Sequence, residues 1–126
     1  MPKGKRSVKN IALIISILAA ASCASNSVSR KPGDALLIGE NSSTLKVMIR
    51  TIDDGEILWV GNYTLGTRAV VAPGEHKVNV MCEFKFSWGI KMVPGNIQIN
   101  AQSSTDYKIT GRLSSDEKSC NLSASI

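Results

Sequence analysis

Residues 76–86 of this 126-residue chain, HKVNVMCEFKF, carry the clearest structural signal in the sequence. Apolar and polar side chains alternate along it. From residue 78 on, the even-numbered positions are apolar: Val78, Val80, Cys82, Phe84 and Phe86. The odd-numbered positions are Lys77, Asn79, Met81, Glu83 and Lys85. Because successive side chains of a strand point to opposite faces, this period of two predicts a β-strand with one buried face. Antiparallel sheets commonly keep their other face in solvent.

Shorter segments with the same period flank this strand on both sides. We expect further strands at Ala35–Ile38, Leu45–Ile52, Glu56–Val60, Arg68–Ala72, Ile97–Asn100, Asp106–Gly111 and Cys120–Ile126. The turn-forming pairs Asp54-Gly55, Pro73-Gly74 and Pro94-Gly95 separate several of them. Seven or eight short strands without a convincing helical stretch predict an all-β fold, a small antiparallel β-sandwich, with an open barrel as the alternative. Parallel pairing is not expected, because its crossovers need more chain than these connections offer.

The N-terminus has the pattern of a targeting segment. Four basic residues among the first nine precede the apolar run Ile11–Ala21. A helix needs roughly 20 apolar residues to cross a bilayer, so this run predicts a cleaved signal rather than a permanent span. The tetrapeptide Ala20-Ala21-Ser22-Cys23 resembles the lipobox of bacterial lipoproteins. That resemblance implies removal of residues 1–22 and lipidation of Cys23; the alternative is an ordinary secretory signal cut near Ala21 or Ala24.

The same resemblance implies a location in the cell envelope. In bacterial lipoproteins an aspartate after the cysteine retains the protein at the inner membrane, and here that position is Ala24. We therefore expect an outer-membrane lipoprotein facing the periplasm. Residues 23–33, which are polar and end in Pro32-Gly33, predict a flexible tether, and residues 34–126 predict a single domain.

The basic charge of the chain belongs to this leader. The formal net charge is +5, but four of the 15 basic residues and none of the 10 acidic residues precede Cys23. The mature chain therefore has 11 positive and 10 negative groups, a net charge of +1. Such a balance gives no broad field for phosphate backbones, so we expect no nucleic-acid partner.

Of the three cysteines, two remain after Cys23 is assigned to the lipid. Cys82 and Cys120 both lie on the apolar parity of their strands. An even pair in an oxidising compartment predicts one disulfide, placed in or at the edge of the core. Two buried free thiols are the alternative.

The segment Val70–Val80, with its Pro-Gly-x-His-x-Val-x-Val pattern, resembles PEGA-type β-sandwich modules and related small bacterial lipoproteins. The turn Ile52-Asp53-Asp54-Gly55 stands where such modules have an Ile-Asp-Gly-like turn, and Ala101–Ile109 resembles a later strand. The resemblance implies a non-catalytic surface or periplasmic module and supplies no functional residues.

Catalytic and metal chemistry have few candidates. His76 is the single histidine, and its neighbour Glu75 is expected on the opposite face of the strand, so we expect His76 to pack at a turn. One histidine and two bridged cysteines cannot build a zinc site. Asp53, Asp54 and Glu56 could attract calcium but lack the spacing of calcium loops. We expect no metal and no cofactor.

Apolar residues in connecting segments are the remaining candidates. Trp88, Ile90 and Met92 follow the long strand without clean alternation, and they are a possible contact for a partner. We favour the alternative that Trp88 folds back to cap a small core. Core packing is also expected for a second apolar group, Trp59 and Tyr63.

These observations favour a non-catalytic binding or structural module on the periplasmic face of the outer membrane. Its partner would be another envelope protein or a second copy of the chain. The alternative is an inhibitor or small-ligand binder, such as a periplasmic lysozyme inhibitor, which also uses a small disulfide-stapled β fold. An enzyme is not expected, because the sequence has no catalytic constellation.

Overall fold

The computed structural model describes residues 30–126. The expected signal peptide (1–22), the lipidated Cys23 and the tether as far as residue 29 lie outside the described residues. Within residues 30–126 no helix has the length and hydropathy to span a bilayer. Seven strands form in this part of the chain: β1 Ala35–Gly39, β2 Leu45–Ile52, β3 Arg68–Val71, β4 Gly74–Phe86, β5 Gly89–Ala101, β6 Asp106–Leu113 and β7 Cys120–Ser125.

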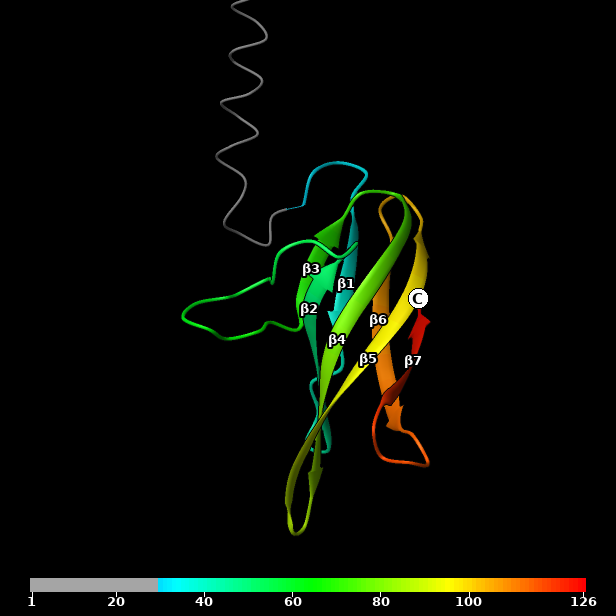
Figure 1. Cartoon of the computed structure of the whole chain (residues 1–126). Coiled ribbons are helices and arrows are strands. Elements are labelled where there is room, and N and C mark those ends of the chain that lie inside the picture. The colour runs from blue at the N-terminus through cyan, green and yellow to red at the C-terminus, as the bar shows by residue number, and fades with distance from the viewer. Residues whose placement is uncertain (1–29) are drawn as a thin grey trace, which may run out of the picture.

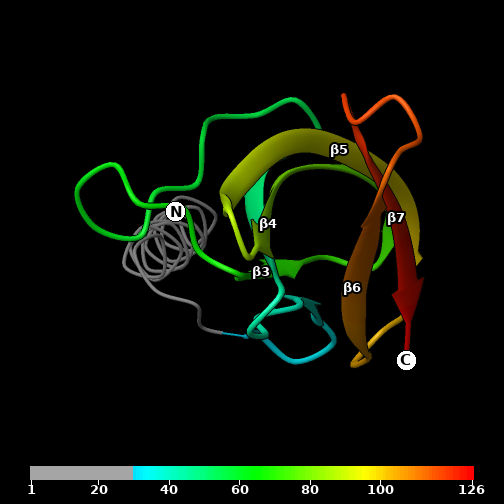
Figure 2. The ribbon, with the colours of Figure 1, turned by 90° about the horizontal axis from the view of Figure 1, so that it is seen from below.

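The strands form two sheets, which confirms the predicted β-sandwich. One sheet has the order β3-β1-β6-β7 and the other has the order β2-β4-β5 (Figure 1). Their inner faces share one core, in which Leu37, Ile49 and Ile109 are almost completely buried. Seen along the strands, β4 and β5 curve toward β7, so that the two sheets approach each other closely on that side (Figure 2).

One pair of strands is parallel, and the expectation of purely antiparallel pairing is wrong for it. β1 and β6 run in the same direction, with Leu36 opposite Asp106 and Ile38 opposite Lys108. Every other pair is antiparallel. A parallel pair needs a long crossover. Here the chain between β1 and β6 contains the whole second sheet, so that sheet itself supplies the crossover.

The predicted disulfide is confirmed. Cys82 on β4 and Cys120 on β7 are bonded, with their Cα atoms 6.3 Å apart. Both are buried, and the bond links one sheet to the other through the core. Close approach at this point requires small neighbours. A Cβ on Gly95 of β5 would lie 2.7 Å from the carbonyl oxygen of Cys120.

The strand expected at Ile97–Asn100 is much longer than predicted, because Pro94-Gly95 is not a turn. β5 runs from Gly89 through both residues to Ala101 and pairs with β4 along its full length. Proline is tolerated in a sheet on an edge strand, where its missing N–H need not face a neighbour. β5 is such an edge. The connection from β4 to β5 is therefore the two-residue turn Ser87-Trp88.

The strand expected at Glu56–Val60 does not form. The chain turns at Asp53 and Asp54, which both have positive φ (54° and 56°), a conformation that aspartate tolerates better than most residues. The returning segment makes a single ladder-like bond to β2, from Leu58 N–H to the Arg50 carbonyl at 2.9 Å. Farther along the same edge, the N–H of Ile49 bonds to the Gly66 carbonyl instead. Residues 53–67 thus form a loop that projects from the side of the sandwich (Figure 1).

The start of the described chain is fastened to the domain. Arg30 pairs with the Asp106 carboxylate and donates to the carbonyl of Asp34. The Gly33 carbonyl accepts the N–H of Ser104 at 3.1 Å. Residues 30–33, which were expected in the tether, therefore lie against the end of the sandwich where β1 and β6 begin. The β4–β5 turn lies at the opposite end (Figure 1).

Candidate functional site

The tip of the β4–β5 hairpin carries exposed apolar side chains on both of its faces. We call this set, Phe86, Trp88, Ile90 and Met92, the hairpin-tip patch. Trp88 is 70% exposed, so the expectation that it folds back over the core is wrong. The reason is strand length: β4 and β5 each have 13 residues, whereas the strands of the other sheet have at most eight. The hairpin consequently extends beyond the body of the sandwich (Figure 1).

Three aromatic rings form a ladder along the inner face of this hairpin. Phe84 and Phe86 have ring centroids 6.5 Å apart with planes 20° apart, and Phe86 and Trp88 are 5.2 Å apart with planes 10° apart. Exposure rises along the ladder, from 8% at Phe84 to 40% at Phe86 and 70% at Trp88. The buried Phe84 thus fixes the position of two rings that have little other cover. Gly89, opposite Phe86 in the register, adds no side chain beside them.

The outer face of the hairpin adds two aliphatic side chains. Ile90 lies opposite Lys85 and Met92 opposite Glu83, so the apolar groups alternate with charges across the two strands. The inner side of β5 at the same level carries Lys91, whose Nζ lies 3.3 Å from Oε1 of Glu117. An inward-pointing charge and the proline at position 94 both discourage the addition of another strand to this edge. The patch can therefore bind through its side chains, with aromatic rings that bury much area at little conformational cost.

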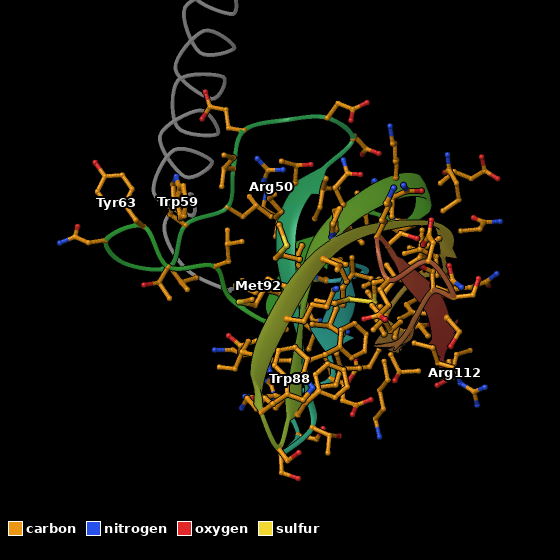
Figure 3. All side chains as sticks on the ribbon, turned by 60° about the horizontal axis from the view of Figure 1, so that its bottom comes forward. Arg50, Trp59, Tyr63, Trp88, Met92 and Arg112 are labelled. Atoms are coloured by element: carbon orange, nitrogen blue, oxygen red, sulfur yellow. A yellow bond between two sulfur atoms is a disulfide. The ribbon has the colours of Figure 1, made fainter. Side chains whose placement is uncertain are left out.

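The loop 53–67 carries a second exposed group, which we call the loop patch: Ile57, Leu58, Trp59, Val60 and Tyr63. Core packing was expected for Trp59 and Tyr63 and is wrong for both. Trp59 is 46% exposed and Tyr63 is 85% exposed, and the two rings meet edge to face with centroids 5.6 Å apart. Figure 3 shows them on the projecting loop, well separated from Trp88.

His76 packs at a turn, as expected, and both of its ring nitrogens are engaged. Nδ1 lies 2.6 Å from Oδ2 of Asp53, and Nε2 lies 2.7 Å from the carbonyl oxygen of Ala72. Both partners are acceptors, so only the doubly protonated ring satisfies them together. Burial of the ring lowers the pKa of His76, but its hydrogen bonds to Asp53 and Ala72 outweigh burial and raise the pKa above 6.5. No ring nitrogen is left to act as a general base.

The acidic turn that was considered for calcium is occupied by donors from β4. The hydrogen bond from His76, followed by the one from the Lys77 N–H, holds the pKa of Asp53 below its ordinary value of 3.8. Oδ1 of Asp54 lies 3.4 Å from Nζ of Lys77 and 3.4 Å from Nδ2 of Asn79. Over the described part of the chain, no three His, Cys, Asp or Glu side chains are grouped so that they could hold a metal ion.

An open cleft of about 540 Å³ lies on the outer face of the first sheet. Arg68 and Lys108 flank Ile38 from the neighbouring strands, and Glu40 stands beside them. Hydrogen bonds from Thr110 and then from Ser42 lower the pKa of Glu40 from its ordinary value of 4.5, so its carboxylate is ionised and already bonded. The lining combines the apolar Ile38 and Ile109 with charged and hydroxyl groups, and the Thr110 hydroxyl donates to the Glu40 carboxylate.

Several features of these sites were not predicted from the sequence: Phe86 in the hairpin-tip patch, Ile57, Leu58 and Val60 in the loop patch, and the contact of Asp53 with His76. Phe86 was expected on the buried face of its strand. Its side chain does point to that face, but it is 40% exposed. Asp53 was not connected with His76, because 23 residues separate them. The Pro-Gly pair before His76 and the Asp-Asp-Gly turn were both recognised as turns. What the chain did not reveal was that the two turns lie at the same end of adjacent strands.

Comparisons with a collection of protein-family models, with curated proteins and with solved structures found no match to this chain. The resemblance to PEGA-type modules therefore stays a prediction from the residues of Val70–Val80.

Proposed function

We propose that this protein is a lipid-anchored, non-catalytic module that binds an envelope protein at the periplasmic face of the outer membrane. The observation that carries the proposal is the hairpin-tip patch, at the end of the sandwich opposite residue 30. A module fastened to a bilayer through its N-terminus would present this tip away from the membrane. Its occupant is then a protein rather than the anchoring lipid surface.

The anchor is supported by the sequence before the described residues. A basic start, the apolar run Ile11–Ala21 and the lipobox-like Ala20-Ala21-Ser22-Cys23 lead into a polar segment and then into the domain. Two or more acyl chains on Cys23 would hold the chain firmly, because a single chain binds a membrane only marginally. Ala24 supports the outer membrane as the destination. Mass spectrometry of the membrane-extracted chain tests this part: a Cys23 without lipid would contradict it.

Docking is supported by the chemistry of the tip. Tryptophan is among the residues that contribute most to binding energy at protein interfaces. The ring of Trp88 stacks on Phe86, and Phe86 stacks on the buried Phe84. The Trp88 ring is therefore held in place before any partner binds. A preorganised anchor loses little conformational entropy on binding. The nearby Glu83 and Lys85 would add polar contacts at the rim.

Site-directed photocrosslinking in living cells tests the docking surface. A photoreactive residue placed at Ser87, in the tip, should join the full chain to one defined envelope protein or to a second copy of the chain. The matched control is Ser123, an exposed serine on β7, from which that product should be absent. Trp88→Ala should lower the yield from Ser87 at least tenfold, whereas Asn121→Ala should leave it unchanged. Equal products from both positions, or none from Ser87, would overturn the docking proposal.

A second candidate is an inhibitor of a periplasmic enzyme such as lysozyme. The observation that favours it is the shape of the hairpin, a narrow projection that could enter an active-site cleft (Figure 1). Inhibition of lysozyme at stoichiometric dose, lost in Trp88→Ala, would support this candidate. Unchanged lysozyme activity at excess protein would exclude it.

A further inference from the structure

The loop patch is an apolar surface without a partner among the described residues. Four consecutive apolar side chains, Ile57–Val60, are each between 36% and 49% exposed, and Tyr63 stands farther out. Between Ile57 and Thr67 the chain carries no charged residue. A soluble domain gains nothing from holding such a run in water, so the run requires an explanation.

The loop is held in this exposed position from both ends. At its start, the Asp53 N–H donates to the Lys77 carbonyl at 2.8 Å, and its carboxylate accepts from His76 and from the Lys77 N–H. At its end, the Gly66 carbonyl bonds to Ile49 and the Thr67 carbonyl bonds to Gly39. Both ends of the loop are therefore fixed to β1, β2 and β4, while its apolar side chains are exposed.

The interior of the loop is also organised. The Val60 N–H donates to the Thr64 carbonyl at 2.7 Å, and the Val60 side chain packs on Gly66. Tyr63 has φ of 57°, a left-handed conformation that is uncommon for a side chain of this size. Such outliers persist where the surroundings hold them, and they cluster at functional sites. Here the ring of Tyr63 points outward and makes an edge-to-face contact with Trp59.

The position of the loop relative to the proposed lipid anchor at Cys23 indicates which surface its apolar side chains can reach. Arg30 is bonded to the end of the sandwich, and six residues, 24–29, lie between it and Cys23. Fully extended, that segment spans only about 25 Å, so a lipid on Cys23 would keep the domain close to the bilayer. The loop projects from the half of the molecule nearer to residue 30, whereas Trp88 lies at the far end (Figures 1 and 3). Of the two exposed apolar groups, the loop patch is the one within reach of the membrane.

We propose that the loop patch rests in the headgroup layer of the bilayer that anchors the chain, as a second membrane contact that orients the domain. The inference rests on the anchor proposed above. Tryptophan and tyrosine are enriched at this depth because their rings are apolar with one polar atom. Asp53 and Asp54, at the base of the loop, are engaged by His76, Lys77 and Asn79 and face β4, whereas Glu56, the carboxylate next to Ile57, is exposed. The contact is made by the uncharged run between Ile57 and Thr67, so we expect it to form with neutral lipid.

A patch of this size binds a membrane weakly by itself and becomes effective through the tether. Attachment at Cys23 makes the contact intramolecular, and short linkers give effective concentrations of roughly the millimolar range. The free domain should then bind vesicles weakly, and the attached domain should keep its loop in the interface most of the time.

The two tryptophans of the chain make the test direct, because each belongs to one patch. The mature chain, from Cys23 to Ile126, is coupled through the Cys23 thiol to a maleimide lipid in phosphatidylcholine vesicles. The other two cysteines are bonded to each other and do not react. Trp88→Phe leaves Trp59 as the only reporter, and Trp59→Phe is the matched control with Trp88 alone.

Lipids brominated on their acyl chains should quench Trp59 at least twofold and leave Trp88 unquenched, in low salt and in 1 M salt alike. An unquenched Trp59, equal quenching of both tryptophans, or loss of quenching in high salt would overturn the inference. Leu58→Asn should reduce the quenching of Trp59, whereas Ile90→Asn at the tip should not. Because the coupling is chemical, this result is independent of whether cells lipidate Cys23, which the mass of the native chain decides separately.

Discussion

His76 and Asp53 form a hydrogen bond of 2.6 Å between Nδ1 and Oδ2 that joins the β2 turn to the start of β4. The other ring nitrogen holds the carbonyl of Ala72, just before the β3–β4 turn. One imidazolium thus fastens three consecutive elements at one end of the sandwich, and it also fixes the base of the loop 53–67.

The stability of the domain should fall as the pH rises above neutrality. The pKa of His76 is raised above its ordinary value of 6.5, so protonation favours the folded state. The stabilisation is complete below about pH 6.5 and is lost as the pH rises through the folded pKa. We expect the urea midpoint to decrease between about pH 6 and pH 9. Because His76 is the only histidine, His76→Gln should remove this slope; a variant with the wild-type slope would contradict the assignment.

Acid should weaken the hydrogen bond between His76 and Asp53 by protonating the Asp53 carboxylate. The pKa of Asp53 is lowered below 3.8, so its contribution is present above that value and is lost as the pH falls through the folded pKa. Glu40 and Asp116, whose pKa values are also lowered by hydrogen bonds from Thr110 and Ser114, act in the same direction. Asp53→Asn, which tolerates the same backbone conformation, should flatten part of the decline in urea midpoint between about pH 5 and pH 2. If the urea midpoint of the variant depended on pH as in the wild type, the Asp53 carboxylate would not be ionised in its hydrogen bond with His76.

Removal of the disulfide should cost a large share of the stability. The bond closes a loop with a sequence separation of 38, for which the chain-entropy relation gives about 4 kcal/mol. Domains of this size are stable by roughly 5 to 15 kcal/mol in total. The double variant Cys82→Ala, Cys120→Ala should therefore show a much lower urea midpoint at pH 7. The reduced wild-type chain should behave similarly, and a shift below about 1 kcal/mol would contradict the prediction.

Gly95 should not tolerate a side chain. An alanine Cβ would lie 2.7 Å from the backbone oxygen of Cys120, so β5 and β7 would have to separate. Overpacking of this kind costs about 1 to 3 kcal/mol. The matched control is the adjacent Asn96→Ala, an exposed position, which should change the free energy of unfolding by less than about 0.5 kcal/mol. Equal stability of the two variants in urea titrations would show that the strands can move apart freely.

Phe84 and Trp88, at the two ends of the aromatic ladder, should contribute very differently to the stability of the domain. Phe84→Ala should destabilise the domain by about 3 to 5 kcal/mol, because Phe84 is 8% exposed and belongs to the core. Trp88→Ala should cost no more than about 1.5 kcal/mol, the value of one stacked aromatic pair. Urea unfolding measures both. A large loss of stability in Trp88→Ala would mean that Trp88 serves the fold rather than a partner.

The parts of the fold that were predicted well are those that depend on nearest neighbours in the chain. The alternation in residues 76–86 identified both the strand and its buried face, since burial at Val78, Val80 and Cys82 follows the predicted parity. The parity of Cys82 and Cys120 likewise predicted a bond inside the core. A turn was predicted at Asp54-Gly55 and lies one residue earlier, at Asp53 and Asp54, but Glu56–Val60 does not return as a strand.

The errors concern relations between segments distant in the chain. Pro94-Gly95 has the local signature of a turn, and only its place on an edge strand beside Cys120 explains why β5 continues through it. Trp88 and Trp59 were expected in the core because large aromatic residues are commonly buried. Whether a ring reaches the core depends on how far its strand or loop extends beyond the opposite sheet.

The all-β class and the faces of the strands follow from the residues alone, because period and parity are properties of the local backbone; the bond between Cys82 and Cys120 follows from their even number once Cys23 is set aside. The parallel pairing of β1 with β6, the contact of His76 with Asp53 and the exposure of the two tryptophans at separate places come from the packing of the two sheets. Each of these depends on strand order and strand length across two packed sheets, which no local pattern of side chains specifies.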